Sequence, residues 1–486
     1  MALTTRKAIA FGVTAGYVGL ILQLASSMLL ARLLTPTEIG IYTAGFSVVA
    51  IAHLFRDFGV NQYLIQEHEL TREKISAAFT LTLTTSWILG LTIFLLATPA
   101  ARFFGEPGVK LLISLLSINF FIIPFGSITI AFLRKNLRFE VTAIIGFVAS
   151  FVGVITSVTT ALQGASYMCL AYGSIAECLC LVALSVAARP PDLQFGIGLK
   201  GARGIFKFAS TVGAGNIISR IGTSGTDAII ARAIGINDLG YFSRATGTFS
   251  LFERIFISSV NGIVLPLFSK NRMDLTKLQE NYLKSVNYTL AFSWPFFAFL
   301  IMYTDDVILV LYGSQWESAV PLVKALSIAG FILPIVLFID SLFISISRPD
   351  VALYISLMTN ISKLILISFA AWTWGLYAAI TALAASFFIK AAISCVLLKV
   401  VLGLKLRLLI HCGLKTLPLL LGTILPPILI VSSEILVSDS PFFRILILAF
   451  ASGVGWLASL LISKHPFSYE MIAAYRSIPY INRWLP

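Results

Sequence analysis

The chain alternates long apolar runs with short polar segments. Fourteen runs have about 20 mainly apolar residues, the length that a helix needs to cross the hydrocarbon core of a bilayer. They begin near Ala8, Ile39, Ser76, Val109, Val141, Ser166, Phe206, Leu239, Ser285, Val320, Val351, Gly375, Leu409 and Phe443. The pattern predicts an all-α integral membrane protein with about 14 transmembrane helices, and twelve or thirteen spans are also compatible with it.

The composition supports this interpretation. Of the 486 residues, 58% are hydrophobic and 12% are charged, which is more apolar than a soluble core of this size requires. No polar segment between the runs exceeds about twenty residues. A soluble catalytic domain needs roughly 50 residues or more, so we expect no enzyme activity.

The formal net charge of +13 is explained by topology rather than by nucleic-acid binding. With an even number of spans and the N-terminus inside, most of the 35 lysines and arginines fall in cytoplasmic segments, as the positive-inside rule requires. The outer segments hold Arg32, Arg102, Lys110, Arg232 and Arg444. Both termini are therefore predicted to be cytoplasmic.

The sequence also repeats itself weakly at an offset of 200 residues. The pairs are Lys7 with Lys207, Arg32 with Arg232, Gly40 with Gly240, and Val60-Asn61 with Val260-Asn261. We expect two pseudo-symmetric six-helix bundles, 1–190 and 206–401, joined by a cytoplasmic connector at 191–205 and followed by a helix pair and tail at 402–486. The spacing of Lys200, Arg203 and Lys207 predicts a short interfacial helix in the connector.

The block at residues 31–66 resembles the polysaccharide-transporter family of oligosaccharide and O-antigen (Wzx-like) flippases. That family lies in the MOP superfamily, together with the MATE-type multidrug exporters and the lipid II flippases. The residues that carry the resemblance are Ala31-Arg32-Leu33-Leu34-Thr35-Pro36, Glu38, Gly40, Tyr42, Asp57, Gly59 and Leu64-Ile65-Gln66, with a weaker echo at Ala231-Arg232, Gly235, Leu239-Gly240-Tyr241 and Ser243-Arg244-Ala245. The resemblance implies a bacterial inner-membrane protein that moves a polyprenyl-diphosphate-linked sugar to the outer leaflet.

The seventh apolar run is unusually polar. Its polar side chains recur at intervals of three and four residues, which places them on one helical stripe: Asn216, Arg220, Thr223, Ser224 and Asp227. A charge at mid-bilayer costs at least about 2.5–3.5 kcal/mol unless it faces a wet cavity or a partner. The stripe therefore faces substrate or a coupling ion, or else Arg220 and Asp227 form an internal ion pair.

Every basic residue within or at the end of a span lies in the second half: Arg220, Arg244, Arg254, Lys324, Lys363 and Lys390. A diphosphate needs such cationic donors, and arginine can bind it with two parallel hydrogen bonds. We expect Arg220 and Arg244, with Lys363 and Arg254, to form a cationic substrate site, with Asn216, Thr223 and Ser224 lining it. Lys324 and Lys390 fit equally well as residues that reach the interface.

Three acidic residues, Asp227, Asp340 and Glu177, fall within the predicted spans. Asp227 and Asp340 are candidates for ion coupling by protonation or sodium binding, whereas Glu177 is interpreted as structural. Near the inner end of the second run, His53, Arg56 and Asp57 form a candidate cytoplasmic gate, with a solvated helix end as the alternative.

We expect no metal and no cofactor. The five cysteines have no metal-ligand spacing with a histidine. The glycine pattern from Gly196 to Gly201 has no preceding strand and so does not indicate dinucleotide binding. Asp305-Asp306, which resembles a metal-binding pair, falls in a short outer loop.

These observations favour a flippase that works by alternating access in surface-polysaccharide biosynthesis, for lipopolysaccharide, exopolysaccharide or capsule. Its expected partners are a polyprenyl-diphosphate-linked oligosaccharide, the bilayer and polysaccharide polymerase or export machinery. A MATE-like small-molecule exporter is the main alternative. A membrane sugar polymerase or glycosyltransferase fits less well, because no sizeable outer loop carries paired acids.

Overall fold

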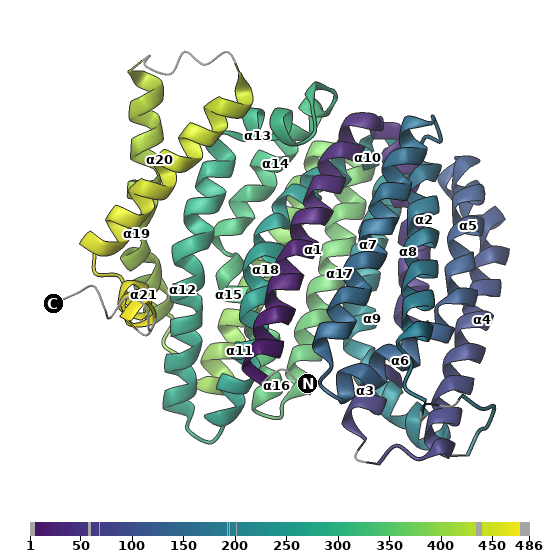
Figure 1. Ribbon diagram of the computed structural model, residues 1–486. Helices are drawn as coiled ribbons and strands as arrows, with labels where there is room; N and C mark the ends of the chain where they lie inside the picture. The colour runs from purple at the N-terminus through teal and green to yellow at the C-terminus, as the bar shows by residue number, and fades with distance from the viewer. Residues whose placement is uncertain are drawn as a thin grey trace. The chain divides into compact units, whose positions relative to one another are not determined.

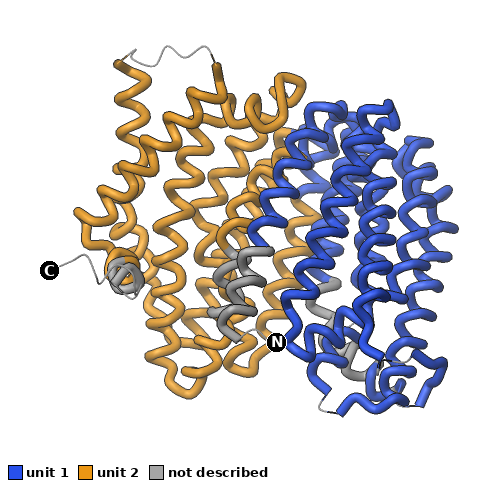
Figure 2. Tube along the Cα trace, in the orientation of Figure 1, with its two compact units in different colours: residues 1–243, 367–376 blue, residues 244–366, 377–486 orange. Residues whose placement is uncertain are grey.

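The computed structural model describes residues 5–476 except 57–59, 68, 192, 194, 201 and 434–439. It does not describe the side chains of residues 5–15, 203, 206–217, 257–263 and 472–476. Every element in the described part is helical, which confirms the predicted all-α class (Figure 1). The chain forms two compact units (Figure 2): unit 1 holds Met1–Ser243 and Ile367–Leu376, and unit 2 holds Arg244–Leu366 and Tyr377–Pro486.

Unit 1 is a bundle of long helices with two short ones near its lower end in Figure 1. Its helices are α1 (Thr5–Leu33), α2 (Pro36–Arg56), α3 (Val60–Gln66), α4 (Arg72–Phe104), α5 (Gly108–Ile122), α6 (Pro124–Lys135), α7 (Phe139–Leu162), α8 (Met168–Ala187) and α9 (Ala202–Ala233). Helix α10 (Ile236–Phe249) begins in unit 1 and ends in unit 2.

Unit 2 mixes long helices with short broken ones. Its elements are the π-helical segment η1 (Glu253–Ile257), α11 (Ser258–Lys270), α12 (Leu275–Met302), α13 (Thr304–Leu311), η2 (Ser314–Ala319), α14 (Val320–Ser327), η3 (Ile328–Phe331), α15 (Leu333–Leu337), α16 (Ile339–Ser345), α18 (Leu376–Leu402), α19 (Arg407–Ser432), α20 (Pro441–Ile462) and α21 (Pro466–Arg476). Helix α17 (Pro349–Trp374) begins in unit 2 and ends in unit 1.

In the described part of the chain, ten helical segments are long and apolar enough to cross a membrane. Two bent pairs raise the number to 12 if each counts as one span: α5 with α6, bent by 52°, and the segment Ser314–Phe331 with Leu333–Ser345, bent by 66°. The other two predicted runs coincide with α9 and with α10 to α11, which carry Arg220, Asp227 and Arg244. The protein is thus a multi-pass membrane protein, and the number 14 stays a prediction.

Both bends have a proline near the start of the second helix. Pro124 opens α6 and Pro334 lies in the first turn of α15. Proline has no backbone N–H, and its ring clashes with the preceding turn, so a helix that has a proline in its interior bends or breaks.

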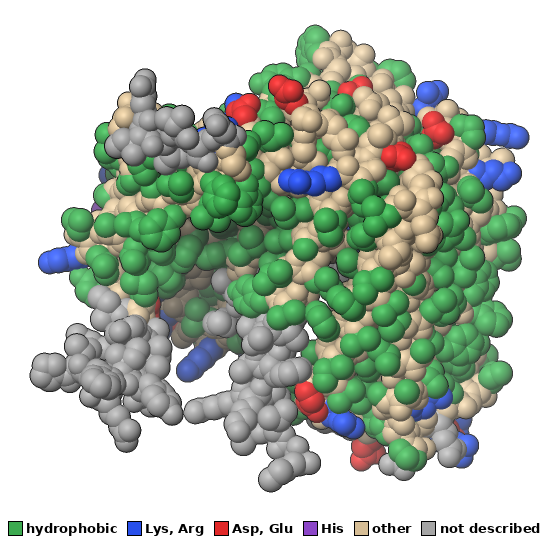
Figure 3. Space-filling view, turned by 45° about the horizontal axis from the view of Figure 1, so that its top comes forward, with side chains coloured by type: hydrophobic (Ala, Val, Ile, Leu, Met, Phe, Trp, Pro, Cys, Tyr) green, Lys and Arg blue, Asp and Glu red, His purple; other side chains and the backbone are tan. Residues whose placement is uncertain are grey.

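The surface of the molecule suits a lipid environment, since hydrophobic side chains are spread over much of the face that Figure 3 shows.

The connector does not form the separate short helix that its basic residues predict. In the described residues, 195–199 have no regular secondary structure, and α9 begins at Ala202, so that Arg203 and Lys207 lie in the first turns of this long helix. Leu193 is buried, and the Phe195 ring stacks on Phe79 of α4 with centroids 4.7 Å apart. The backbone N–H of Gly198 donates to Thr80 Oγ1 at 3.0 Å.

The glycines of this segment explain both its conformation and the dinucleotide-like pattern. A Cβ at Gly196 would lie 2.8 Å from the Ser76 Oγ, so only glycine lets the backbone approach α4 this closely. Arg189 completes the attachment, because its guanidinium carbon lies 3.8 Å from the centroid of the Phe195 ring. The connector is therefore a strap along α4.

Unit 2 is held by aromatic side chains and by the docking of its last helix. Phe292 of α12 packs against Trp456 of α20 and Phe467 of α21, with centroids 5.2 Å and 5.0 Å apart. Just before α21, His465 is buried, and its Nδ1 accepts the Phe467 N–H at 3.2 Å. The ring proton therefore lies on Nε2, which donates to Asn287 Oδ1 at 2.9 Å.

We predict that this docking weakens in acid. Burial, the larger cause, and nearby Lys415 lower the pKa of His465 to about 4, whereas an unfolded histidine titrates near about 6.5. As the pH falls from about 6.5 towards 4, the unfolded state binds a proton at this histidine that the native state does not bind. The free energy of unfolding therefore falls, and at pH 5 it should be lower than at pH 7.5 by about 2 kcal/mol. In detergent, the melting temperature of the wild type should drop more between pH 7.5 and 5 than that of His465→Gln. His411→Gln is the control, and equal drops in wild type and His465→Gln would contradict the assignment.

Candidate functional site

The polar stripe predicted for the seventh run lies on α9 in unit 1. Arg220 and Thr223 are exposed and Asp227 is half-buried, so this part of the stripe faces outward from the helix packing. Ser224 is 3% exposed and packs inside the unit instead. The side chain of Asn216 lies outside the described residues. The structure therefore places Arg220, Thr223 and Asp227 on one helical face.

Arg244 of α10 is held by two aromatic rings of unit 2. Its guanidinium carbon lies 5.4 Å from the ring centroid of Tyr312 and 5.3 Å from that of Trp316, both within cation–π range. Thr248, one turn further along α10, is buried and hydrogen-bonds to the Tyr312 hydroxyl at 3.2 Å. The guanidinium of Arg244 thus lies against two aromatic faces, which position it by cation–π contact.

The acidic candidate Asp340 of α16 is paired. Its Oδ2 lies 3.5 Å from the Nζ of Lys390 on α18, and both side chains are partly exposed. Lys324 pairs with Asp305 at 2.7 Å, and Arg444 pairs with Asp306. Each member of the metal-like Asp305-Asp306 pair is thus balanced by a cation.

The other predicted cationic residues of unit 2 lie on separate helices. Arg254 is exposed in the π-helical segment η1, directly after the half-buried Glu253. Lys363 is half-buried on α17. π-Helical turns often mark functional positions, because the extra residue redirects the side chains around it.

The predicted gate residues of α2 point into unit 1. The His53 ring stacks on Phe120 of α5 with centroids 4.7 Å apart, and the guanidinium carbon of Arg56 lies 5.8 Å from the same centroid. Asp57 lies outside the described residues. His53 and Arg56 thus share one aromatic partner and are half-buried, which differs from the alternative of a solvated helix end.

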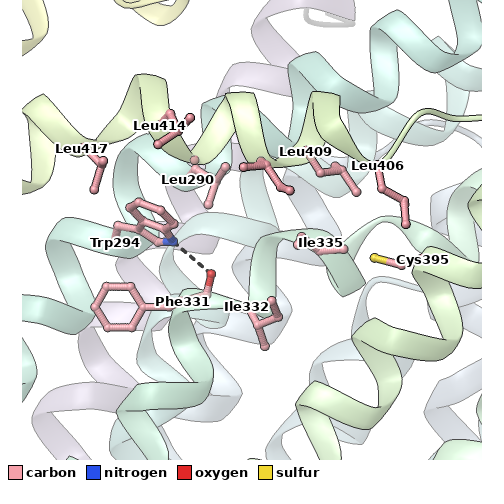
Figure 4. Close-up of a pocket in the computed structure, with 12 residues that line it drawn as sticks. Leu290, Trp294, Phe331, Ile332, Ile335, Cys395, Leu406, Leu409, Leu414 and Leu417 are labelled. Carbon is pink, nitrogen blue, oxygen red and sulfur yellow. Dashed lines mark hydrogen bonds between the residues drawn. The ribbon is translucent and has the colours of Figure 1, made fainter.

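Unit 2 also contains an apolar cavity of about 510 Å³ (Figure 4). Leu290 and Trp294 of α12 form one wall, and residues of η3, α15, α18 and α19 form the others. The Trp294 indole N–H donates to the Phe331 carbonyl at 2.9 Å, which satisfies the polar atom of the indole. The leucines of α19 complete a lining that offers apolar surface and few polar groups, as a site for a hydrocarbon chain requires.

The fold and these intramembrane charges define the class: a multi-pass, all-helical membrane protein. The sequence model of the family described as "Polysaccharide biosynthesis protein" matches residues 29–321, which is more than half of the chain. The chain belongs to this family, which confirms the resemblance carried by residues 31–66.

Relatives and solved structures agree with this membership. The chain is 24% identical to the lipopolysaccharide biosynthesis protein WzxC of Escherichia coli K12 over 68% of each chain. It is also 24% identical to the succinoglycan biosynthesis transport protein ExoT of Rhizobium meliloti, over 66% of this chain and 65% of ExoT. The fold resembles that of the lipid II flippase MurJ, with a TM-score of 0.76 and 16% identity over 96% of this chain and 100% of MurJ.

The aromatic partners of Arg244 were missed from the sequence. Tyr312 and Trp316 are about 70 residues away from Arg244 along the chain, and a single sequence gives no signal for such a contact. A weak local signal existed, since two aromatic residues four apart beside a glycine follow the ninth apolar run. The Asp340–Lys390 pair was likewise not foreseen, although both residues were named.

We predict that Arg244 and Trp316 are energetically coupled. A double-mutant cycle of Arg244→Met and Trp316→Leu, measured as unfolding free energies in mixed micelles, should give a coupling of about 0.5–2 kcal/mol. Tyr312→Phe is the matched control, because it keeps the ring over Arg244 and removes only the hydroxyl that Thr248 contacts. Purely additive effects of Arg244→Met and Trp316→Leu would contradict the coupling.

Proposed function

We propose that this protein is a flippase that moves a polyprenyl-diphosphate-linked oligosaccharide from the inner to the outer leaflet of a bacterial plasma membrane. The observation that carries the proposal is family membership over residues 29–321, combined with a fold that matches a lipid II flippase along 96% of the chain. One relative is named for lipopolysaccharide biosynthesis and another for succinoglycan biosynthesis and transport. The protein acts as a transporter and not as an enzyme.

The negative charge of the proposed substrate suits the positive charge of the proposed site residues. A diphosphate is anionic, and charge-assisted hydrogen bonds from arginine suit it best. Arg244, fixed by two rings, and Arg220, exposed on α9, are the proposed ligands, with Lys363 and Arg254 as further cations. Thr223 supplies a hydroxyl beside Arg220, and Asn216 and Ser224 are the other proposed polar residues of the substrate site.

Two further roles remain proposals. Asp227 and Asp340 are proposed for ion coupling, and His53, Arg56 and Asp57 are proposed for the cytoplasmic gate.

The apolar cavity of unit 2 suits the other end of the substrate. Its walls are mainly leucine, isoleucine, phenylalanine and tryptophan side chains. Two of the helices that supply them, α12 and α19, are apolar enough to span the bilayer. We assign it to part of the prenyl tail, because burying isoprenoid surface in an apolar cavity orients the lipid while its head group stays with the cations.

Alternating access requires two halves that move, and a contact in unit 1 supports their symmetry. Thr37 Oγ1 donates to Asn237 Oδ1 at 3.1 Å, and Thr43 Oγ1 donates to Ser243 Oγ at 3.2 Å, so residues 200 apart contact each other. Helices that meet on a two-fold axis show this reciprocity. We therefore keep the proposal of two six-helix bundles plus a C-terminal pair, 14 spans in all, with both termini cytoplasmic.

The backbone contacts between α2 and α10 are reciprocal in the same way. A Cβ at Gly40 would lie 1.9 Å from the Ile236 carbonyl oxygen, and one at Gly240 would lie 2.0 Å from the Pro36 carbonyl oxygen. Pro36 and Ile236 are themselves 200 residues apart. Gly40 of α2 thus lies against the first residue of α10, and Gly240 of α10 lies against the first residue of α2. In this proposal the contact is the pivot on which the two halves rock.

We predict that export depends on Arg244. A hydrogen bond to a charged group is worth about 1.5–3 kcal/mol, so Arg244→Ala should weaken substrate binding by about tenfold or more. In cells that rely on this protein, surface polysaccharide should fall and lipid-linked oligosaccharide should accumulate. Lys277→Ala, which removes an exposed lysine paired with Asp274, is the control and should export normally. Normal export with Arg244→Ala would remove this residue from the substrate site.

We also predict that the glycine contact tolerates no side chain. Gly40→Ala and Gly240→Ala should each lower the melting temperature and reduce export, because the new methyl group overlaps a carbonyl oxygen. Gly247→Ala on α10 is the matched control, since nothing lies within 4 Å of its Cβ position. If all three variants melt and export like the wild type, the close contact is not part of the working protein.

A drug exporter of the same superfamily is the competing function. It predicts efflux of cationic compounds that disappears with Asp227→Asn while surface polysaccharide is unchanged. Polymerase or export partners would be recognised by co-purification with the intact protein.

A further inference from the structure

The internal repeat continues in the two bent spans, at an offset of 210 residues instead of 200. Both copies share a pattern of leucine, serine, isoleucine and phenylalanine that ends at the proline of the bend. The matching residues are Leu112, Leu116-Ser117-Ile118, Phe121-Ile122 and Pro124 in the first half, and Leu322, Leu326-Ser327-Ile328, Phe331-Ile332 and Pro334 in the second. Because the offset is still 200 at Val60 and Val260, the second half has gained residues before its bent span.

The additional residues lie in the connection that follows α12. Residues 105–111 separate the end of α4 from Leu112, whereas residues 303–321 separate the end of α12 from Leu322. The longer connection contains α13 and η2, and Figure 1 shows α13 near the upper end of α12. We call residues 304–319 the inserted segment. The positive-inside rule predicts that it lies on the outer side of the membrane.

The inserted segment contacts Arg244 and also lines a second cavity of unit 2. Tyr312 and Trp316 are the two aromatic residues that face the Arg244 guanidinium. Between them in the sequence, Gly313 and Ser314 line a cavity of about 330 Å³. One short stretch of chain therefore lies against the proposed diphosphate ligand and forms a wall of this cavity.

The lining of the cavity combines hydrogen-bonding groups of both kinds with apolar surface. Its polar residues come from α13, η2 and α20 and are Asp305, Asp306, Ser314, Glu317 and Arg444. The carboxylates accept hydrogen bonds, the guanidinium donates them, and the serine hydroxyl does both. Aliphatic side chains, among them those of Ile308 and Leu309, provide the apolar part.

Ion pairs hold two of the carboxylates in place. Arg444 donates to both carboxylate oxygens of Asp306, from Nε at 3.1 Å and from Nη2, and the Asp306 side chain is only 15% exposed. Lys324 of α14 pairs with Asp305 at 2.7 Å. Glu317 is exposed, and no ion pair of Glu317 occurs in the described part of the chain. The lining thus keeps a negative charge at Glu317, which disfavours an anionic ligand.

This lining fits a neutral sugar better than it fits an ion. Two of the three carboxylates already have a cation, and among the described residues no group of three or more acidic, histidine or cysteine side chains could hold a metal ion. A pyranose ring carries hydroxyl groups that donate and accept around C–H surfaces, which matches mixed polar groups beside aliphatic ones. The volume of about 330 Å³ falls in the usual range of ligand pockets, about 300–1,000 Å³.

We propose that this cavity binds a neutral sugar unit of the glycan, so that the inserted segment helps to select the substrate. The inference rests on the proposed flippase function, in which the glycan is attached to a diphosphate held by Arg244. Sugar hydroxyl groups donate to the carboxylates and accept from Ser314 and from the remaining N–H groups of Arg444. The carboxylate of Glu317 repels a uronic acid at the same position, which adds selectivity by exclusion.

Occupancy is tested by labelling a Ser314→Cys variant of the full-length protein in lipid nanodiscs with a membrane-impermeant maleimide. Polyprenyl diphosphate that carries glucose should slow the labelling by roughly threefold or more relative to bare polyprenyl diphosphate, because a pocket of this kind buries most of its ligand. The lipid that carries glucuronate should slow it less. Labelling of the native cysteines in the wild type is subtracted. The control is Ser432→Cys, at an exposed serine near the end of α19, and its labelling should not depend on the lipid. Equal labelling of Ser314→Cys with every lipid would overturn the sugar site.

The charge of the cavity is tested by adding Glu317→Lys to Ser314→Cys. The lipid that carries glucuronate should then protect the cysteine better than the one that carries glucose, because the new cation pairs with the uronate. Glu280→Lys is the matched control, since Glu280 is exposed on α12 and does not line the cavity, and it should keep the preference for glucose. An unchanged preference in Glu317→Lys would contradict selection by this residue.

The same lipids separate this inference from the proposed function. If reconstituted wild type moves none of them while the glucose-dependent protection of Ser314→Cys persists, the flippase function fails and the sugar site survives. If the wild type moves the glucose and glucuronate lipids equally fast and no sugar protects the cysteine, the sugar site fails and the flippase function stands.

Discussion

The arrangement of charges in this protein depends on one constraint: a bilayer offers no water to an ionised side chain. The described intramembrane charges meet it in different ways. Asp340 is paired with Lys390, and Arg244 lies against two aromatic rings. His53 and Arg56 share Phe120, and Glu177 has a serine hydroxyl. Ion pairs, aromatic faces and hydroxyl groups are thus the partners that the described residues give to charge within the bilayer.

The repeat at an offset of 200 residues is kept at some positions of the chain and lost at others. The contact of Gly40 with the start of α10, and of Gly240 with the start of α2, uses residues that both halves share. The charges differ between the halves, since positions 20 and 27 are leucine and serine where positions 220 and 227 are arginine and aspartate. The repeated residues thus lie where α2 and α10 meet, and we propose that the departures from the repeat mark the site of an anionic head group.

The sequence predicted the helices well and the contacts poorly, for a physical reason. Apolar runs of bilayer length must be helical, so each predicted run coincides with a helix, with a bent helix pair or, for the eighth run, with the series α10, η1 and α11. Partners such as Tyr312 for Arg244, or Ser150 for Glu177, depend on helix rotation and tilt, which hydrophobicity does not encode. The spacing of Lys200, Arg203 and Lys207 predicted a separate short helix in the connector, yet residues 195–199 form an irregular segment that packs on α4, where Gly196 and the N–H of Gly198 approach closely.

We propose that the protein alone moves a lipid-linked oligosaccharide across a bilayer. To test this activity directly, the purified protein is reconstituted in vesicles that carry a fluorescent polyprenyl-diphosphate sugar in both leaflets, and a membrane-impermeant reagent that modifies the sugar is then added. Protein-free vesicles should protect the inner half of the probe. With the protein present, we predict that almost all of the probe becomes accessible within minutes. Protection of half of the probe in both preparations, with or without ion gradients, would contradict the proposed flippase function.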